Sequence, residues 1–184
     1  MPDDTAIADA SPSTELIQAH IRDVPDFPQP GILFKDITPL LNDGEAFAAA
    51  VDGMAEPFLG AGVDHVVGLE ARGFIFGTPV AMALGAGFVP ARKAGKLPAR
   101  TLAQAYDLEY GTATVEIHAD AVTPGSRVLI VDDVLATGGT GRAAVDLVRK
   151  AGGTVVGFSV LMELEALRGR EKLPDVELHT LLSV

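Results

Sequence analysis

Short apolar runs that alternate with helical patterns constrain the fold of this chain more than any other feature of its sequence. Runs rich in Val, Ile and Leu are expected to form buried strands at residues 64–69, 87–92, 127–131, 154–162 and 176–182. Helical patterns follow the first and third of these runs, at residues 75–84 and 139–151. Apolar strands connected by helices are typical of a parallel sheet that is covered on both faces. The sequence therefore predicts one α/β domain over residues 1–184, with a central parallel β-sheet flanked by helices.

An N-terminal addition precedes the first of these strands. We expect residues 1–12 to form a disordered tail, followed by a short helix. The apolar face of that helix would carry Leu16, Ile17, Ile21 and Val24. Three prolines within residues 25–31 predict an ordered loop rather than regular structure. A second helix is expected over residues 44–59.

A further segment, residues 102–119, lies between the second and third strands of the sheet. Its Thr, Val, Ile and Tyr residues favour an excursion from the sheet with the pattern of a hairpin. The sequence therefore predicts both an N-terminal addition and a hairpin excursion on the α/β core.

The distribution of charge points to a small polyanionic ligand. The chain holds 25 acidic and 14 basic residues and has a formal net charge of −11, which argues against a surface for duplex nucleic acid. From Ala71 to Tyr106, however, there is not one Asp or Glu. The same stretch holds Arg72, Arg92, Lys93, Lys96 and Arg100. This pattern predicts an anion site, and the alternative is an apolar segment with basic ends.

Composition excludes several other classes of protein. The chain has no cysteine, so a disulfide framework, a thiolate nucleophile and a thiolate zinc site are impossible. None of its apolar stretches reaches the roughly 20 continuous residues that a membrane span needs. Residues 1–13 carry no basic residue and lack the form of a secretory signal. We therefore expect a cytoplasmic enzyme without a membrane partner.

The segment Val128–Thr140 is the most informative motif. An apolar strand is expected to deliver the adjacent carboxylates of Asp132 and Asp133 to the carboxyl edge of the sheet, where α/β folds bind ligands. Residues 137–140, with the sequence Thr-Gly-Gly-Thr, then open a helix whose backbone N–H groups can approach a phosphate. Carboxylates accept hydrogen bonds from sugar hydroxyls. A pentose 5-phosphate would fit both halves of the motif.

Three other interpretations start from the same glycines. Gly139, Gly141 and Ala144 match the dinucleotide pattern G-x-G-x-x-A, with Glu163 at a plausible distance for a ribose contact. That pattern places its first glycine directly after the strand, whereas seven residues separate Val131 from Gly139. A capped helix after an acidic turn would explain the glycines but not the paired aspartates. A P-loop is excluded, because no Gly-Lys-Thr or Gly-Lys-Ser follows.

Val128–Thr140 resembles the signature of the type I phosphoribosyltransferases, which bind phosphoribosyl pyrophosphate with a strand, an acidic pair and a loop. Other segments resemble the adenine phosphoribosyltransferases, a branch of that family, and follow in family order. They are Asp26–Leu41, Gly68–Phe74, Arg92–Pro98 and Leu108–Gly111. The likeness runs from about residue 14 to the C-terminus, and it implies the type I phosphoribosyltransferase fold.

The resemblance also implies a division of labour among site residues. Adenine would lie under a hood of about residues 25–41 and contact Leu33, Phe34 and Lys35. The pyrophosphate group would contact Arg72, Arg92, Lys93 and Lys96. Ribose and its phosphate would contact Asp132, Asp133, Ala136, Thr137, Gly138, Gly139 and Thr140. On the residues alone, packing in the core remains an alternative for Phe34, and a solvated carboxylate remains one for Glu109.

The same resemblance implies further properties of the enzyme. Glu109, in a flexible catalytic loop of about residues 98–119, would handle the proton of the purine. A cis peptide is expected at Glu70–Ala71, and Mg²⁺ would be bridged through substrate oxygens without a direct protein ligand. The enzyme would be a homodimer, with Arg92 reaching across the interface.

The implied reaction converts adenine and phosphoribosyl pyrophosphate into AMP and pyrophosphate, which is a purine salvage step. Three alternatives stay open at this point. The acceptor base could be xanthine, hypoxanthine or guanine, or the chain could be a purine-responsive regulator of the same fold. The third alternative is a nicotinamide-dependent dehydrogenase.

Overall fold

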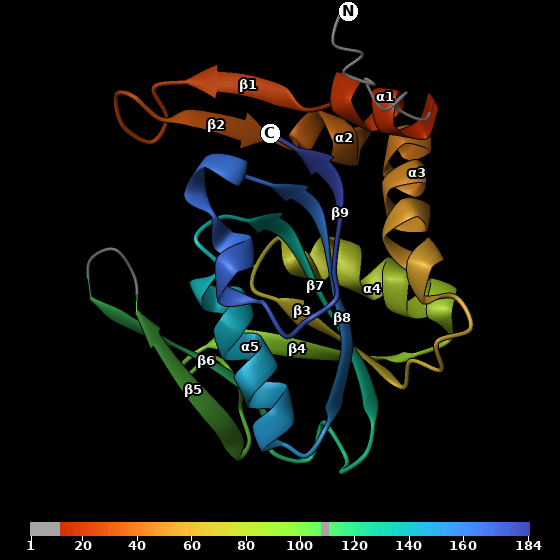
Figure 1. The fold of residues 1–184 in the computed structure, drawn as a ribbon, viewed down its shortest axis with the longest axis vertical. Helices are drawn as coiled ribbons and strands as arrows, with labels where there is room; N and C mark the ends of the chain where they lie inside the picture. Colours follow the sequence, from red (N-terminus) through yellow and green to blue (C-terminus); the bar gives the residue numbers. More distant parts are fainter. Residues whose placement is uncertain (1–11, 108–110) are drawn as a thin grey trace, which may run out of the picture. The chain divides into compact units, whose positions relative to one another are not determined.

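The computed structural model of the protein describes residues 12–107 and 111–184 (Figure 1). The chain divides into two compact units, one that ends at Ala50 and a larger one from Val51 to Val184. Within the described ranges, no helix combines the length and the apolar character needed to cross a membrane.

From residue 12 on, the N-terminal unit contains two short helices, the start of a third, and a β-hairpin. Its elements are α1 (Pro12–Ala19), β1 (Arg22–Pro25), β2 (Leu33–Asp36), α2 (Thr38–Asn42) and the first part of α3 (Gly44–Ala55). The hairpin pairs β1 with β2 in antiparallel register. The rings of Phe27 and Phe34 pack edge to face, with 5.1 Å between their centroids. The prediction that Ile21 and Val24 continue the first helix was wrong. That helix ends at Ala19 because the chain turns into β1, whose backbone pairs with β2.

The larger unit carries the alternation of strands and helices that the sequence predicts. Its strands are β3 (His65–Leu69), β4 (Gly87–Lys93), β5 (Thr101–Asp107), β6 (Thr112–His118), β7 (Arg127–Leu135), β8 (Thr154–Glu163) and β9 (Leu178–Ser183). Its helices are α4 (Gly73–Leu84), α5 (Gly139–Lys150) and the 3₁₀ turns η1 (Glu56–Phe58), η2 (Glu165–Leu167) and η3 (Gly169–Lys172). The predicted hairpin is present as β5 and β6, which pair antiparallel.

Seven strands of the described chain form one sheet, in the order β5-β6-β4-β3-β7-β8-β9. Neighbouring strands from β4 to β9 in this order are parallel, which confirms the predicted parallel core. The hairpin extends that core on one side, because β6 pairs antiparallel with the end of β4. The sheet as a whole is therefore mixed.

The strand order reverses direction between β3 and β7. The chain passes from β3 through α4 to β4 on one side, and from β7 through α5 to β8 on the other. Since parallel crossovers are right-handed, α4 and α5 must cover opposite faces of the sheet, and Figure 1 shows them on its two sides. Open α/β sheets bind ligands beyond the carboxyl ends of their strands at such a reversal point. The ends of β3 and β7 are therefore the expected position of a site.

The hydrophobic core of the larger unit lies between α5 and the sheet. Val128 and Ile130 of β7, Val145 of α5 and Val160 of β8 are fully buried within it. Apolar burial of this kind contributes about 25 cal/mol per Å². The core thus fixes β7, and with it the residues at the end of β7.

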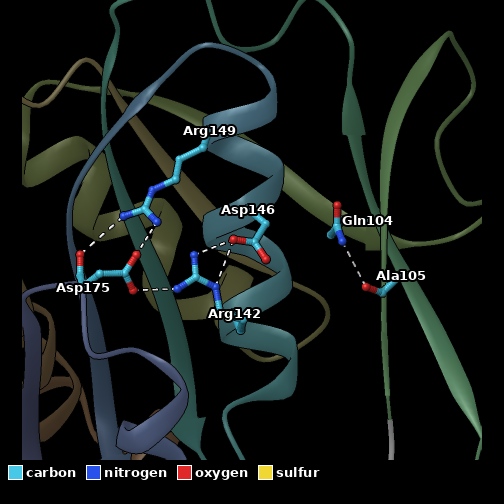
Figure 2. Close-up of polar contacts among 6 residues, drawn as sticks. All are labelled: Gln104, Ala105, Arg142, Asp146, Arg149 and Asp175. Carbon is cyan, nitrogen blue, oxygen red and sulfur yellow. Dashed lines mark hydrogen bonds and ion pairs between the residues drawn. The ribbon is translucent and has the colours of Figure 1, made fainter.

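Ion pairs join α5 to the segment before β9 (Figure 2). Arg142 donates to Asp175 at 2.6 Å and to Asp146 at 3.0 Å, and Arg149 also pairs with Asp175. On the side of the hairpin, Lys150 Nζ donates to the carbonyl of Ala103 at 2.9 Å. Helix α5 is therefore held by side-chain contacts as well as by its apolar face.

Candidate active site

Asp132 and Asp133 lie near the carboxyl end of β7, at the reversal point of the sheet. They are part of the strand, which runs on to Leu135 and pairs there with Glu163 of β8. The sequence prediction ended the strand at Val131, four residues too early. Pairing with β8 extends the strand, because it satisfies backbone groups that an isolated acidic segment would expose to water.

The two carboxyl groups have different surroundings. Asp133 is 5% exposed, and Arg72 Nε lies 2.8 Å from its Oδ2, so the buried charge has a cationic partner. Asp132 Oδ1 accepts the backbone N–H of Asp133 at 2.9 Å. Burial of the Asp132 carboxyl, followed by the negative charge of Asp133, raises the pKa of Asp132 well above its ordinary value.

Helix α4 begins directly beside this pair. A Cβ on Gly73, the first residue of α4, would lie 2.8 Å from Asp132 Oδ1 and 3.0 Å from the carbonyl of Val131. A glycine is therefore required where the turn after β3 passes the aspartates. This turn contains the cis peptide Glu70–Ala71, as the resemblance implies.

The loop from Ala136 to Thr140 connects the end of β7 to α5. Gly138 adopts a left-handed conformation with φ of 75° and stands at the N-cap of α5. The first turn of a helix leaves backbone N–H groups without acceptors inside the helix, and the helix dipole favours an anion there. The first turn of α5 carries no acidic side chain, and its last turn carries Arg149 and Lys150. The loop therefore has the backbone and the charge pattern of a phosphate site.

The cationic stretch forms its own cluster around Glu70. Arg92 Nη2 donates to Glu70 Oε1 at 3.2 Å, and the backbone N–H of Lys93 donates to Glu70 Oε2 at 2.9 Å. These bonds, the Lys93 bond first, hold the pKa of Glu70 below its ordinary value. Arg92 Nη1 also donates to the carbonyl of Lys96 at 3.2 Å, which orders the turn after β4.

One cavity brings the aspartate pair and part of the cationic cluster together. It has a volume of about 320 Å³ and is lined by Asp132 and Asp133, by Arg72, Arg92 and Lys93, and by Thr140 of the loop. A smaller adjoining space of about 80 Å³ is lined by Asp132 and by the loop from Ala136 to Gly141. The predicted sugar, phosphate and pyrophosphate contacts therefore converge at the end of β7. Lys96 is exposed and does not line the cavity.

Two polar residues to which the sequence analysis gave no binding role also line this cavity. Glu70 follows the last residue of β3, and Tyr106 lies on β5. Glu70 could have been found, because it is the last acidic residue before the 36-residue stretch without carboxylates. Tyr106 had no such signal, since only the pairing of the hairpin with the sheet brings it to the cavity.

The remaining predicted residues belong to the N-terminal unit or fall outside the described residues. Leu33, Phe34 and Lys35 are on β2 in the N-terminal unit, where Leu33 is 51% exposed and Lys35 Nζ lies 2.7 Å from Asp23 Oδ1. Glu109 lies outside the described residues, as does the tail up to Ser11. The roles given to these four residues stay predictions.

Comparison with known proteins identifies the family. A model described as "Phosphoribosyl transferase domain" matches residues 40–182. An adenine phosphoribosyltransferase of Thermobifida fusca is 73% identical over 169 residues, covering 92% of this chain and 96% of that relative. A crystal structure of the enzyme from Rhodothermus marinus has a TM-score of 0.89 at 54% identity, covering 94% of this chain and 98% of that one. The structure from Saccharomyces cerevisiae, complexed with D-2,5-dideoxy-2,5-imino-altritol 1,6-bisphosphate and adenine, has a TM-score of 0.88 at 40% identity, covering 92% and 98%. The chain therefore belongs to the adenine phosphoribosyltransferases of the phosphoribosyltransferase family.

Proposed function

We propose that this protein transfers the 5-phosphoribosyl group of phosphoribosyl pyrophosphate to adenine, giving AMP and pyrophosphate. One observation supports this most strongly. A single cavity at the reversal point of the sheet is lined by an acidic pair, by arginines and by the start of a helix. A ligand with a diol, a phosphate and a pyrophosphate matches these three surfaces. The structure of the yeast relative contains adenine and a bisphosphate, which supports a purine base and a phosphorylated compound as the ligands of this protein.

The sugar phosphate would be bound by β7 and the loop that follows it. Asp132 and Asp133 would accept hydrogen bonds from the ribose hydroxyls. Backbone N–H groups from Ala136 to Thr140 would bind the 5-phosphate at the start of α5. The carboxylates would also lie near the positive charge that develops on the ribose as the bond to pyrophosphate breaks.

Pyrophosphate, the leaving group, would be bound by Arg72, Arg92, Lys93 and Lys96. Cations placed where negative charge grows in the transition state usually give the largest electrostatic term in catalysis. Arg72 pairs with Asp133, and Arg92 pairs with Glu70. These ion pairs hold the guanidinium groups at the cavity, and pyrophosphate would compete with the two carboxylates for them.

Mg²⁺ fits this site as a partner of the substrate. Within the described residues, no group of three or more His, Asp or Glu side chains could hold a metal ion. Asp132 and Asp133 place carboxylate oxygens at the cavity, where they would be indirect partners of the cation. Mg²⁺ usually keeps several of its waters, so substrate oxygens would hold it without a direct protein ligand. When bound, it would neutralise charge on the pyrophosphate oxygens.

The base and its proton are assigned from the family resemblance. Phe34 would pack on adenine, and backbone groups of Leu33 and Lys35 would read its edge. Glu109 would accept or relay the proton that adenine releases. The hairpin of β5 and β6 would help to exclude water, which would otherwise capture the ribosyl cation.

Product analysis tests the proposal directly. The protein is mixed with Mg²⁺ and phosphoribosyl pyrophosphate, and with adenine, hypoxanthine, guanine or xanthine in separate reactions. We expect AMP and pyrophosphate from adenine and far slower conversion of the other bases. Faster conversion of an oxopurine would show that the alternative acceptor is correct. A cytoplasmic location and a homodimer also remain proposals, and light scattering in solution measures the second.

A further inference from the structure

Glu163 is a buried carboxylate that the proposed reaction does not use. It is the last residue of β8, is 4% exposed and pairs in register with Leu135, the last residue of β7. The residue after Leu135 is Ala136, where the phosphate loop (residues 136–140) begins. Glu163 therefore lies at the base of this loop without belonging to it.

Arg170 compensates the buried charge of Glu163. Its Nε lies 3.2 Å from Glu163 Oε1 and its Nη2 lies 2.5 Å from Oε2, so the guanidinium contacts both carboxylate oxygens. A buried carboxylate is tolerated only when it is paired, and the two-pronged contact fixes the orientation of both side chains. The pair therefore ties the segment that contains Arg170 to the rigid end of β8.

The residue before Arg170 packs directly on the phosphate loop. A Cβ on Gly169 would lie 2.1 Å from the carbonyl oxygen of Ala136 and 3.0 Å from the backbone nitrogen of Gly138. A Cβ on Gly138 would lie 2.3 Å from the carbonyl oxygen of Gly169. The two backbones thus approach more closely than any side chain allows. Displacement of Gly169 would remove the support behind Gly138.

We propose that Glu163 and Arg170 form a positioning pair, which holds Gly169 against the phosphate loop and so fixes the loop for the 5-phosphate of the substrate. This inference rests on the proposed function, because it assigns a support to the same phosphate site. Groups that bind a ligand must be held close to their productive geometry by residues that are themselves fixed. The ion pair provides such a support from outside the cavity.

A ligand site at the ion pair itself is a weaker interpretation. The groove of about 340 Å³ beside Glu163 is lined by three glutamates and two arginines, namely Glu163, Glu165, Glu171, Arg168 and Arg170. Both arginines are already paired, Arg170 with Glu163 and Arg168 with Glu171. The cations of this groove therefore serve the protein's own carboxylates.

The test uses the full-length enzyme and two variants that disturb the support in different ways. Glu163→Gln removes the charge of the pair, while Gly169→Ala keeps the pair and forces the two backbones apart. Both should raise the KM for phosphoribosyl pyrophosphate and the Kd of AMP by about 10-fold, less than the roughly 100-fold that a 1 Å misplacement can cost. The KM for adenine should stay within about 2-fold, because adenine carries no phosphate. The matched control is Arg168→Ala, which removes the exposed ion pair of the same segment and should leave all three constants unchanged.

The outcomes distinguish a failure of the positioning role from a failure of the proposed function. Wild-type constants in both variants would overturn the positioning role, as would an equal rise in the KM for adenine. If Glu163→Gln does not fold, Gly169→Ala and Arg170→Lys decide by the same criteria. A wild-type enzyme that forms no AMP would instead overturn the proposed function, whatever the variants show.

Discussion

The two aspartates at the end of β7 are adjacent in sequence but differ in their electrostatic state. Asp133 has a cationic partner in Arg72, which lies 2.8 Å away. Asp132 is half-buried; the partial loss of its hydration, followed by the negative charge of Asp133, raises its pKa. Asp133 is therefore in an ion pair with an arginine, whereas Asp132 carries a negative charge only at an energetic cost. Each condition leads to a separate prediction.

Asp133→Asn tests the proposed contact with the ribose. The substitution preserves the shape of the side chain and removes both the charge near the reacting carbon and the ion pair with Arg72. We expect kcat/KM to fall by at least ~100-fold, the lower scale for one oriented catalytic group. Steady-state assays of AMP formation measure this. Asp120→Asn, an exposed change after β6, is the control, and full activity in Asp133→Asn would refute the sugar assignment.

Asp132→Asn tests the cost of the raised pKa. When folding raises the pKa of an acid, deprotonation above its ordinary value of 3.8 favours the unfolded chain, so stability is lost as the pH rises. The neutral variant should therefore melt at a higher temperature than the wild type at pH 7. Each kcal/mol of added stability should raise the Tm by about 2–4 °C. The difference in Tm between the variant and the wild type should disappear below pH 3.8. Scanning calorimetry across this range measures it; an unchanged Tm at pH 7 would contradict the prediction.

At the scale of elements, α5 connects the phosphate loop to the rest of the larger unit. Its N-cap is Gly138, and its apolar face packs in the core. Its polar side is joined through Arg142 and Arg149 to Asp175, ahead of β9 (Figure 2). The position of the loop therefore depends on contacts along the whole helix.

The ion pairs of Asp175 predict a pH dependence of stability. Hydrogen bonds from Arg149 and then Arg142 lower the pKa of Asp175 from 3.8 to about 2. A lowered pKa stabilises the fold above pH 3.8, and this contribution is lost as the pH falls through about 2. Asp175→Asn should therefore lower the Tm at pH 7 and have a much smaller effect near pH 2. Thermal melts followed by circular dichroism at both pH values measure this. Because the carboxylate is exposed, solvent will screen the effect, and a loss of equal size at both pH values would exclude an ionic origin.

At the scale of the whole molecule, a ligand that binds only the folded protein must raise its melting temperature. AMP at 100 times its Kd should add about 2.7 kcal/mol of stability, which corresponds to roughly 5–10 °C for a chain of this length. NAD⁺ at the same concentration should leave the Tm unchanged, because the family assignment excludes the dinucleotide interpretation. Dye-based thermal shift assays compare the two ligands. A shift with NAD⁺ alone would contradict the proposed function.

Much of the fold could be predicted because its signals are local. Each strand of the parallel core is a short apolar run, and each connecting helix has its own periodicity. The hairpin of β5 and β6 was likewise indicated by its β-branched and aromatic residues. A hydrophobic pattern depends only on residues that are near one another in sequence, so a single sequence is enough to recognise it.

The errors arise where pairing between distant segments overrides local pattern. Ile21 and Val24 have helical spacing, yet the chain enters β1 because β2 offers it a partner. Strand β7 continues through Asp132 and Asp133 because β8 pairs with it as far as Leu135. No pattern within either segment carries that information.

The sequence by itself determined the chemistry of this protein: an acidic pair, a glycine-rich turn at the start of a helix and a cationic stretch free of carboxylates. These features depend on residue types and on short spacings between them, and both can be read from the sequence. Only the tertiary structure decided which groups share a cavity, that Glu70 and Tyr106 join them, and that Glu163 pairs with Arg170 next to the glycine that packs on the loop. The physical reason is that charges and backbones interact through space over a few ångströms, and strand order alone brings residues such as Arg72 and Asp133 within that range.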